Sequence, residues 1–329
     1  MRVRRPILPP RLVLLPSLSL LAALLPFVLA IDAVTGEEED APTPGEIARA
    51  VSRGADWLRR DFEGGFRDRT WHDPVELVVL TLGHAGANLQ DPVYAAGIET
   101  LVTAEPRYTY RASLMAMALA RANPRLHQPK LVHCAQWLVD TQLADGAWGY
   151  PGGATGGAHR PEARTVPAPE PTDGPRDRVV VRRGVPVSTY GDAQGDFSNT
   201  QFAILGLRAC RDAGVHVPKA TWKDALAYLR RTQRSDGGWG YVMGGEQDGA
   251  SYASLTCAGL CSVAICLHAT GRRVTRSDAT LRKGLHWLDT HFEPERNVGI
   301  DRSSIIGPST WQLYHLYALE RAGQVLTFS

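Results

Sequence analysis

The stretch WLVDTQLADGAWGY, residues 137–150, returns later in the chain as YLRRTQRSDGGWGY, residues 228–241. Each copy begins with an aromatic residue and Leu, continues through Gln and Asp-Gly, and ends on Trp-Gly-Tyr. Asp-Gly is a tight-turn pair, so each copy indicates the end of a helix followed by a turn. We expect Gln to bond free backbone groups and Trp to pack over helix ends. The repeated structural residues are Trp137, Gln142, Gly146, Trp148, Tyr228, Gln233, Gly237 and Trp239.

Weaker copies of this motif begin at Trp57-Leu58 and at Trp287-Leu288. A second repeated element ends each unit with a Gly or, once, an Asn that is expected to stop a helix. These helix stops are Gly86, Asn123, Gly214, Gly271 and Gly323. Gly and Asn are the residues that most readily form a left-handed helix C-cap. The five stops therefore predict five helices that end in the same way.

Between these markers the apolar residues recur with helical spacing. Segments that end in the stops are apolar nearly all round, which is typical of helices buried on every side. We predict such inner helices near 74–85, 109–122, 198–213, 251–269 and 309–322. Amphipathic segments alternate with them, near 45–62, 91–104, 130–143, 218–233 and 278–292. The pattern predicts an all-α fold of about five helical hairpins over residues 46–323.

The Gln-x3-Gly-x-Trp turns after an aromatic-Leu pair resemble the QW repeat of squalene and hopene cyclases. Residues 45–323 are similar to the terpenoid-cyclase and protein-prenyltransferase superfamily, and more closely to bacterial prenyltransferase and squalene-oxidase repeat proteins. The resemblance implies an (α/α) toroid whose inner helices surround an apolar cavity. Six hairpins usually close such a ring. With five, the toroid is expected to be open, truncated or completed by a partner.

The termini and one insertion lie outside the repeats. Residues 1–11 carry four arginines and an uncharged apolar run follows to Ala30, which predicts a signal peptide or an uncleaved membrane anchor. Either alternative exports the remainder, because cytoplasmic flanks carry the positive charge. Residues 31–45 are predicted to be an acidic, Pro-rich linker and residues 324–329 a tail. Residues 151–190, with 7 Pro and 6 Gly, indicate an insertion loop.

Charge and composition exclude some classes of protein. The chain has 329 residues, 44% apolar and 21% charged, which is an ordinary globular composition. Its formal charge of +2 becomes −2 for residues 31–329 once the four N-terminal arginines are subtracted. A nearly neutral body gives no electrostatic reason to expect nucleic-acid binding. Five cysteines are too few for a disulfide scaffold at this length.

Candidate ligand contacts follow from the resemblance, because substrates of such toroids meet the starts of the inner helices. These candidates are Trp71, His72, Asp73, Tyr110, Arg111, Asp192, Asp196, Asn199, Gln201, Tyr252, Trp311, Tyr314 and His315. Aromatic faces stabilise cations, so an aromatic wall would suit isoprenoid chemistry. The alternative is that these residues pack the core or cap helices, as Asp73 before Pro74 would.

The only candidate catalytic residue is Asp196. Asp196-Phe197-Ser198-Asn199-Thr200 stands where squalene-hopene-type cyclases carry Asp-x-Asp-Asp-Thr. Ser198 and Asn199 replace the two central acids, and neither can protonate an alkene. We therefore expect the chain to lack cyclase activity and Asp196 to cap a helix. An enzymatic role is left open, with a non-enzymatic role favoured.

No cofactor or metal site is predicted. The zinc pair Asp-x-Cys of protein prenyltransferases is missing from the sequence, and three of the five cysteines share one apolar segment. Neither a nucleophile elbow nor a phosphate loop occurs. Arg111 beside tyrosines leaves a polysaccharide lyase as a remote alternative. The resemblance thus supports two hypotheses: an exported toroid that binds an apolar ligand or a protein, or an enzyme acting on isoprenoid lipids.

Overall fold

The computed structural model describes residues 42–63, 75–149, 195–241, 250–300 and 311–326. Within these ranges the chain forms ten α-helices and no β-sheet, so the predicted all-α class is confirmed. The amphipathic helices are α3 (Pro44–Phe62), α5 (Pro92–Thr103), α7 (Gln128–Asp140), α9 (Lys219–Thr232) and α11 (Ala279–Thr290). The apolar helices are α4 (Val75–His84), α6 (Thr109–Ala122), α8 (Phe197–Asp212), α10 (Ala253–Ala269) and α12 (Gln312–Val325). Each lies within three residues of its predicted range at both ends.

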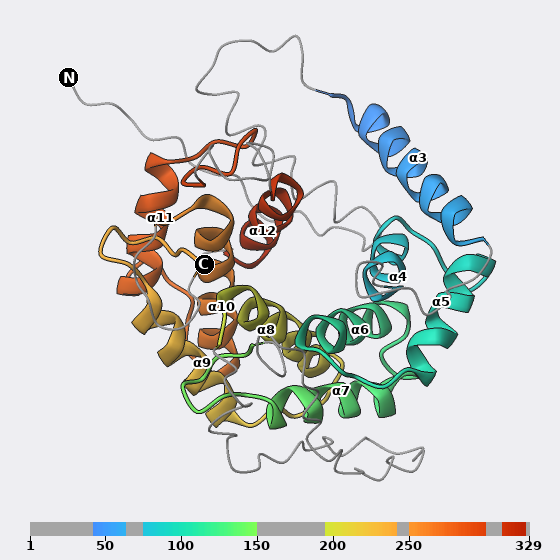
Figure 1. The fold of residues 1–329 in the computed structure, drawn as a ribbon, viewed down its shortest axis with the longest axis horizontal. Helices are drawn as coiled ribbons and strands as arrows, with labels where there is room; N and C mark the ends of the chain where they lie inside the picture. Colours follow the sequence, from blue (N-terminus) through green and yellow to red (C-terminus); the bar gives the residue numbers. More distant parts are fainter. Residues whose placement is uncertain (1–41, 64–74, 150–194, 242–249, 301–310, 327–329) are drawn as a thin grey trace, which may run out of the picture.

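The ten helices form a curved double layer (Figure 1). The apolar helices α4, α6, α8, α10 and α12 line the inside of the curve, and the amphipathic helices lie outside them. Along the inner layer α6 packs on α4 and α8, and α10 packs on α8 and α12. Outer helix α5 contacts α4 and α6, and α7 contacts α6 and α8. The alternation of inner and outer helices is therefore present, and a toroid that is open, truncated or completed by a partner stays a prediction.

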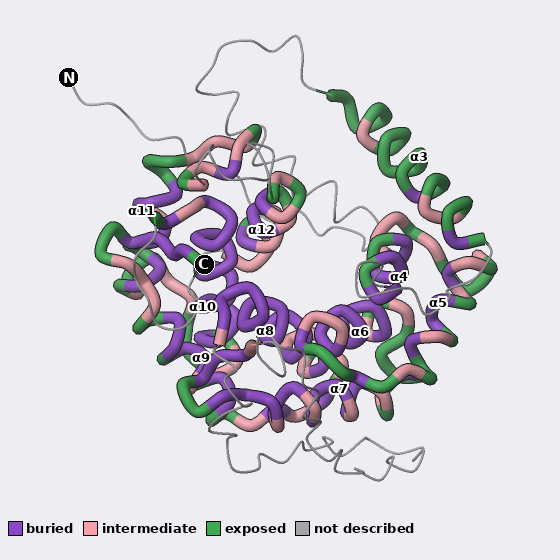
Figure 2. Tube along the Cα trace, in the orientation of Figure 1, coloured by how far each residue is buried: buried purple, intermediate pink, exposed green. Residues whose placement is uncertain are grey.

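Burial follows the two layers (Figure 2). Residues 253–267 of α10 and 197–207 of α8 are buried without interruption. Outer helix α3 buries only Ala55 and Phe62. A helix that is apolar all round is stable only when other helices cover it on every side. The sequence of α8 and α10 thus places them in the middle of the core.

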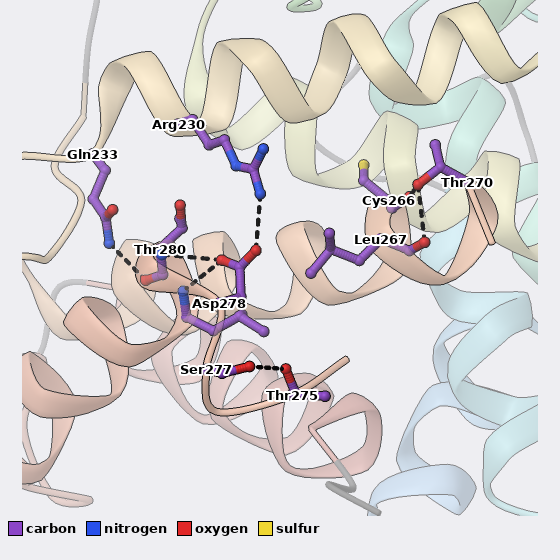
Figure 3. A network of polar contacts seen from close by, with 10 residues as sticks. Arg230, Gln233, Cys266, Leu267, Thr270, Thr275, Ser277, Asp278 and Thr280 are labelled. Atoms are coloured by element: carbon purple, nitrogen blue, oxygen red, sulfur yellow. Dashed lines mark hydrogen bonds and ion pairs between the residues drawn. The ribbon is translucent and has the colours of Figure 1, made fainter. Parts of the chain in front are cut away.

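The repeated turns at residues 137–148 and 228–239 have matching hydrogen bonds. Gln142 Nε2 donates to the carbonyl oxygens of Gly146, at 3.1 Å, and Thr221, at 3.0 Å. Gln233 Nε2 donates to those of Gly237, at 2.8 Å, and Thr280, at 2.9 Å. Figure 3 shows this reach from Gln233 to Thr280. Each Gln therefore ties the end of one outer helix to the first turn of the next.

The two tryptophans close the same turns. Trp148 Nε1 donates to the Leu138 carbonyl oxygen at 2.7 Å, and Trp239 Nε1 donates to that of Leu229 at 2.9 Å. Both rings are fully buried. The two tryptophans therefore occupy equivalent positions, each between an outer and an inner helix.

The weaker copies are described only in part, because residues 64–74, which follow Trp57 and Leu58, lie outside the described residues. The Trp57 side chain is 59% exposed. Trp287 aligns with the first aromatic of the motif, Trp137 and Tyr228, and is likewise largely buried; its Nε1 donates to Asp236 Oδ2 at 3.1 Å and its ring stacks on His291. Within the described residues, the complete set of turn hydrogen bonds is found at the two full motifs.

Three of the five predicted helix stops are confirmed. Gly86, Gly214 and Gly271 have φ of 92°, 94° and 80°, and each helix end carries the paired backbone bonds of a Schellman cap. Asn123 is a correction, because its φ of −163° is extended. It precedes Pro124, which disfavours helical conformations, and its side chain accepts from the amides of the following turn. Gly323 is also a correction, since α12 continues to Val325 and includes part of the predicted tail.

Several predicted segments lie outside the described residues. They are the N-terminal segment 1–30, the linker up to residue 41, the insertion 151–190 and the last three residues. Among the described helices, none has the length and apolar character needed to cross a membrane. The export prediction therefore stays a prediction.

Candidate functional site: an aromatic cluster at the inner helices

The start of α8 is positioned by the first repeated turn. The backbone N–H of Asp196 donates to the Trp148 carbonyl oxygen at 2.9 Å, and the N–H of Trp148 donates to Thr200 Oγ1 at 3.0 Å. Gly146, with φ of 92°, allows the turn that brings Trp148 there. The repeat therefore fixes the position at which the polar residues of α8 enter the core.

Asp196 is the N-cap of α8, as predicted. Its Oδ1 accepts from the Asn199 amide at 2.8 Å and from Ser198 Oγ at 2.7 Å, and its Oδ2 accepts from Asn199 Nδ2 at 2.5 Å. Burial raises the pKa of the carboxyl group, and these donated bonds oppose part of the rise. Ser198 and Asn199, the residues that replace the cyclase acids, thus serve as donors to the remaining one.

Three aromatic rings from three different inner helices meet around Phe202. The Phe202 ring of α8 lies 4.4 Å from the Tyr110 ring of α6, centroid to centroid, and 5.9 Å from the Tyr317 ring of α12. The Phe202 and Tyr317 planes are nearly parallel, at 10°. We call Tyr110, Phe202 and Tyr317 the inner aromatic cluster. Such contacts stabilise by about 0.5–1.5 kcal/mol each beyond the buried area.

Gln201 and Tyr314 form a polar pair next to the inner aromatic cluster. Tyr314 lies one turn before Tyr317 on α12, and its hydroxyl donates to Gln201 Oε1 at 2.5 Å. Gln201 is fully buried. Burial raises the pKa of Tyr314 well above its usual value and also raises that of Tyr317, so both hydroxyls stay protonated. The pair therefore offers neutral hydrogen-bonding groups in an apolar setting.

Two further candidates have structural roles. Tyr252 occupies the N-cap position of α10 without a side-chain cap bond, and burial raises the pKa of its hydroxyl. The cap comes instead from Asn297, whose Oδ1 accepts from the Ser254 amide at 2.9 Å. His315 is buried on α12, with Nε2 3.1 Å from the Glu293 carbonyl oxygen, and burial lowers its pKa.

Arg111 and Trp311 are the remaining candidates that the structure describes. Arg111 Nε donates to Oε1 of the fully buried Glu76 at 2.7 Å, and this ion pair satisfies part of the arginine's charge. Trp311 is exposed at the start of α12, where its φ of 62° is left-handed. Trp71, His72, Asp73 and Asp192 lie outside the described residues.

The sequence analysis missed three residues of this region. Phe202 and Tyr317 complete the inner aromatic cluster, and Glu76 pairs with Arg111. Tyr317 lies three residues after Tyr314, a spacing that puts both on one helix face and could have indicated it. No sequence signal joins Phe202 to Tyr317, because they meet only through the packing of α8 and α12.

No grouping typical of a metal site occurs in the part of the chain that the structure describes. Among those residues, no three His, Cys, Asp or Glu side chains gather around one point. All five cysteines are buried thiols, and burial raises the pKa of Cys257 and Cys261 to about 12. A thiol with so high a pKa is a poor nucleophile and metal ligand.

The comparisons with known proteins do not identify the chain. No protein-family model matches it, and no curated protein is similar to it. The resemblance to terpenoid cyclases and prenyltransferases therefore depends on the repeated turns and on the order of the helices.

Proposed function

We propose that this protein is an exported, non-catalytic helical-repeat module of the terpenoid-cyclase type that binds an apolar, isoprenoid-like molecule. The inner aromatic cluster is the observation that carries the proposal. The Phe202 ring contacts one ring from α6 and one from α12, in the inner layer of helices. In cyclases of the kind that the chain resembles, the ligand is expected at this layer. Flat aromatic faces suit the flat, unsaturated units of an isoprenoid chain.

The state of Asp196 supports binding over catalysis. The carboxyl group accepts three hydrogen bonds, two from side chains and one from the helix backbone. All three bonds are donated to the carboxyl group, whereas protonation of an alkene needs a neutral carboxyl group held as a donor. Neither oxygen faces a second carboxylate among its hydrogen-bond partners, so nothing holds the group as a strong acid.

Export would place the module near its ligand. The basic and then apolar N-terminus, followed by an acidic linker, supports a location outside the cytoplasm, with the module close to the membrane. Membrane lipids are then the nearest source of an apolar molecule. No cofactor is needed for this role.

The test is lipid extraction and mass spectrometry of the purified full-length protein, followed by binding of a fluorescent isoprenoid alcohol. We expect a copurified polyprenoid-like lipid, and at least a tenfold weaker affinity for Phe202→Ala and Tyr110→Ala. Tyr108→Ala is the matched control, since Tyr108 is exposed two residues before Tyr110. Unchanged binding in both cluster variants would contradict the proposal, and turnover of squalene or of a polysaccharide would favour an enzyme.

A protein partner is the second candidate. Helix α12 exposes Trp311, Leu313 and Leu316, and the Leu313 side chain is 84% exposed. Exposed apolar side chains gathered on one helix are typical of protein contact surfaces. Leu313→Asp should abolish such an association and leave binding of the isoprenoid alcohol unchanged, as measured by light scattering and fluorescence.

A further inference from the structure

Buried polar groups beside the inner aromatic cluster remain without partners. Gln201 is fully buried, and its Nε2 finds no hydrogen-bond partner among the described residues. The hydroxyl of Tyr317 is buried in the same way, on a ring that stacks against Phe202. Leaving a buried donor unsatisfied is costly, so native structures rarely do it without a reason.

The unused groups are oriented by a specific contact. The Tyr314 hydroxyl donates to Gln201 Oε1 at 2.5 Å, which uses the acceptor end of the amide and leaves its two N–H donors free. The free amide donor belongs to Gln201, which directly precedes Phe202 in α8. The free hydroxyl belongs to Tyr317, whose ring stacks on Phe202. Both groups are neutral, and both can donate to an oxygen atom.

The charges near this polar pair disfavour an anion. The guanidinium of Arg321 lies 5.5 Å from the centroid of the Tyr317 ring, and it is paired with Glu320. The carboxyl group of Asp196 lies close enough to Tyr314 to affect its titration. A phosphate or carboxylate head group would meet a like charge there, and the arginine beside the Tyr317 ring is already paired with Glu320.

We propose that the ligand carries one uncharged acceptor oxygen, as an alcohol, ketone or ester carbonyl does, and that Gln201 Nε2 donates to it. This inference rests on the proposed apolar-ligand function of the same cluster. The apolar body of the ligand lies on Phe202 and the neighbouring rings, and its oxygen satisfies the buried donors. A pure hydrocarbon leaves those donors unsatisfied.

The test compares three fifteen-carbon probes with the same chain on the full-length protein: farnesol, farnesene and farnesyl phosphate. We expect farnesol to bind at least tenfold more tightly than either of the others by isothermal titration calorimetry. Gln201→Leu should bring the farnesol-to-farnesene ratio to about one, because an apolar residue no longer distinguishes the two. The double variant Gln201→Leu/Tyr314→Phe removes both polar partners together and gives the same result if the single variant folds poorly.

Gln324→Leu is the control, as it makes the same chemical change near the end of α12, one residue before the helix ends. Equal affinities of farnesol and farnesene in the unmodified protein would overturn the inference and leave the proposed apolar site standing. Tightest binding of farnesyl phosphate would also overturn it. If no probe binds and Phe202→Ala changes nothing, the proposed function itself fails.

Discussion

The two full repeats, around Trp148 and Trp239, share a scaffold and differ at the helix that each one starts. In both, the Gln side chain joins the end of one outer helix to the start of the next. In both, the indole N–H of Trp donates to a backbone carbonyl oxygen of the preceding outer helix. In both, the Trp backbone amide donates to a threonine in the first turn of the next inner helix, Thr200 in α8 and Thr256 in α10.

The difference begins one turn earlier, at the N-caps. The N-cap of α8 is Asp196, whose side chain caps its own helix. The N-cap of α10 is Tyr252, which makes no side-chain cap bond, and Asn297 accepts from the Ser254 amide instead. The positions of Asn199 and Gln201 in α8 correspond to Leu255 and Cys257 in α10. Equal scaffolds with unequal polar residues indicate that the scaffold is structural and that any binding specificity lies in α8.

The largest expected effect tests whether the two scaffolds are equivalent. Trp148→Ala and Trp239→Ala should each lower the free energy of unfolding by about 3–5 kcal/mol, because each empties a fully buried ring site. The two losses should agree within about 1 kcal/mol, as measured by urea denaturation. Trp57→Ala, in a degenerate and exposed copy, should cost less than about 0.5 kcal/mol. A tolerated change at one full repeat would break the comparison.

The turn glycines should give the next largest effect, and an unequal one. An added Cβ at Gly146 would lie 2.2 Å from the Asp224 carbonyl oxygen, and one at Gly237 would lie 2.7 Å from that of Lys283. Both glycines also have φ near 90°, which strains an alanine. Alanine at either position should therefore lower the free energy of unfolding by about 2–4 kcal/mol, and the loss should be larger at Gly146. Gly54→Ala is the control, because it meets nothing within 4 Å in α3 and should stabilise slightly. Thermal melts of the three variants decide the order.

At the N-cap of α8, a third prediction separates capping from acid chemistry. Asp196→Ala leaves buried donors unpaired and should cost about 1–3 kcal/mol. Asp196→Asn should cost less than about 1 kcal/mol, since Asn caps nearly as well and the Asn199 amide can turn its unused oxygen toward the new donor. Ligand binding should be unchanged in the Asn variant. A large loss of stability from Asn alone would show that the charge is essential.

The smallest expected effect is a pH dependence confined to one repeat. Burial raises the folded-state pKa of Asp196, so the native state retains a proton that the unfolded chain has already released. Asp196 therefore adds stability below its unfolded pKa, and that contribution is lost as pH rises through the folded pKa. Relative to Asp196→Asn, the unmodified protein should lose stability across this acidic window. Tyr252→Phe, at the equivalent site, should show no such change in denaturation at pH 4 to 7.

Helix positions were well predicted because their causes are local. The repeated motif and the 3.6-residue apolar period located all ten described helices, and Asp-Gly located the two turns. The errors were local as well. Pro124 fixes Asn123 in an extended conformation, and Gly323 lies inside a helix that packing extends by about a turn.

The candidate site was predicted only in part. Tyr110, Gln201 and Tyr314 were expected at helix starts and do lie at the inner aromatic cluster or beside it. Phe202 was known only as an apolar position, and Tyr317 was not singled out. Arg111 was a candidate contact, yet its partner Glu76 had no signal in the sequence.

By itself, then, the sequence determined the helices, the capping role of Asp196 and the equivalence of the two Trp turns, because each depends on residues close together in the chain. Only the tertiary structure decided that Phe202 stacks on Tyr317, that Tyr314 orients Gln201, and that Glu76 pairs with Arg111. These contacts join residues 35 to 115 positions apart, and helix periodicity says which face is buried but not which residue of another helix covers it.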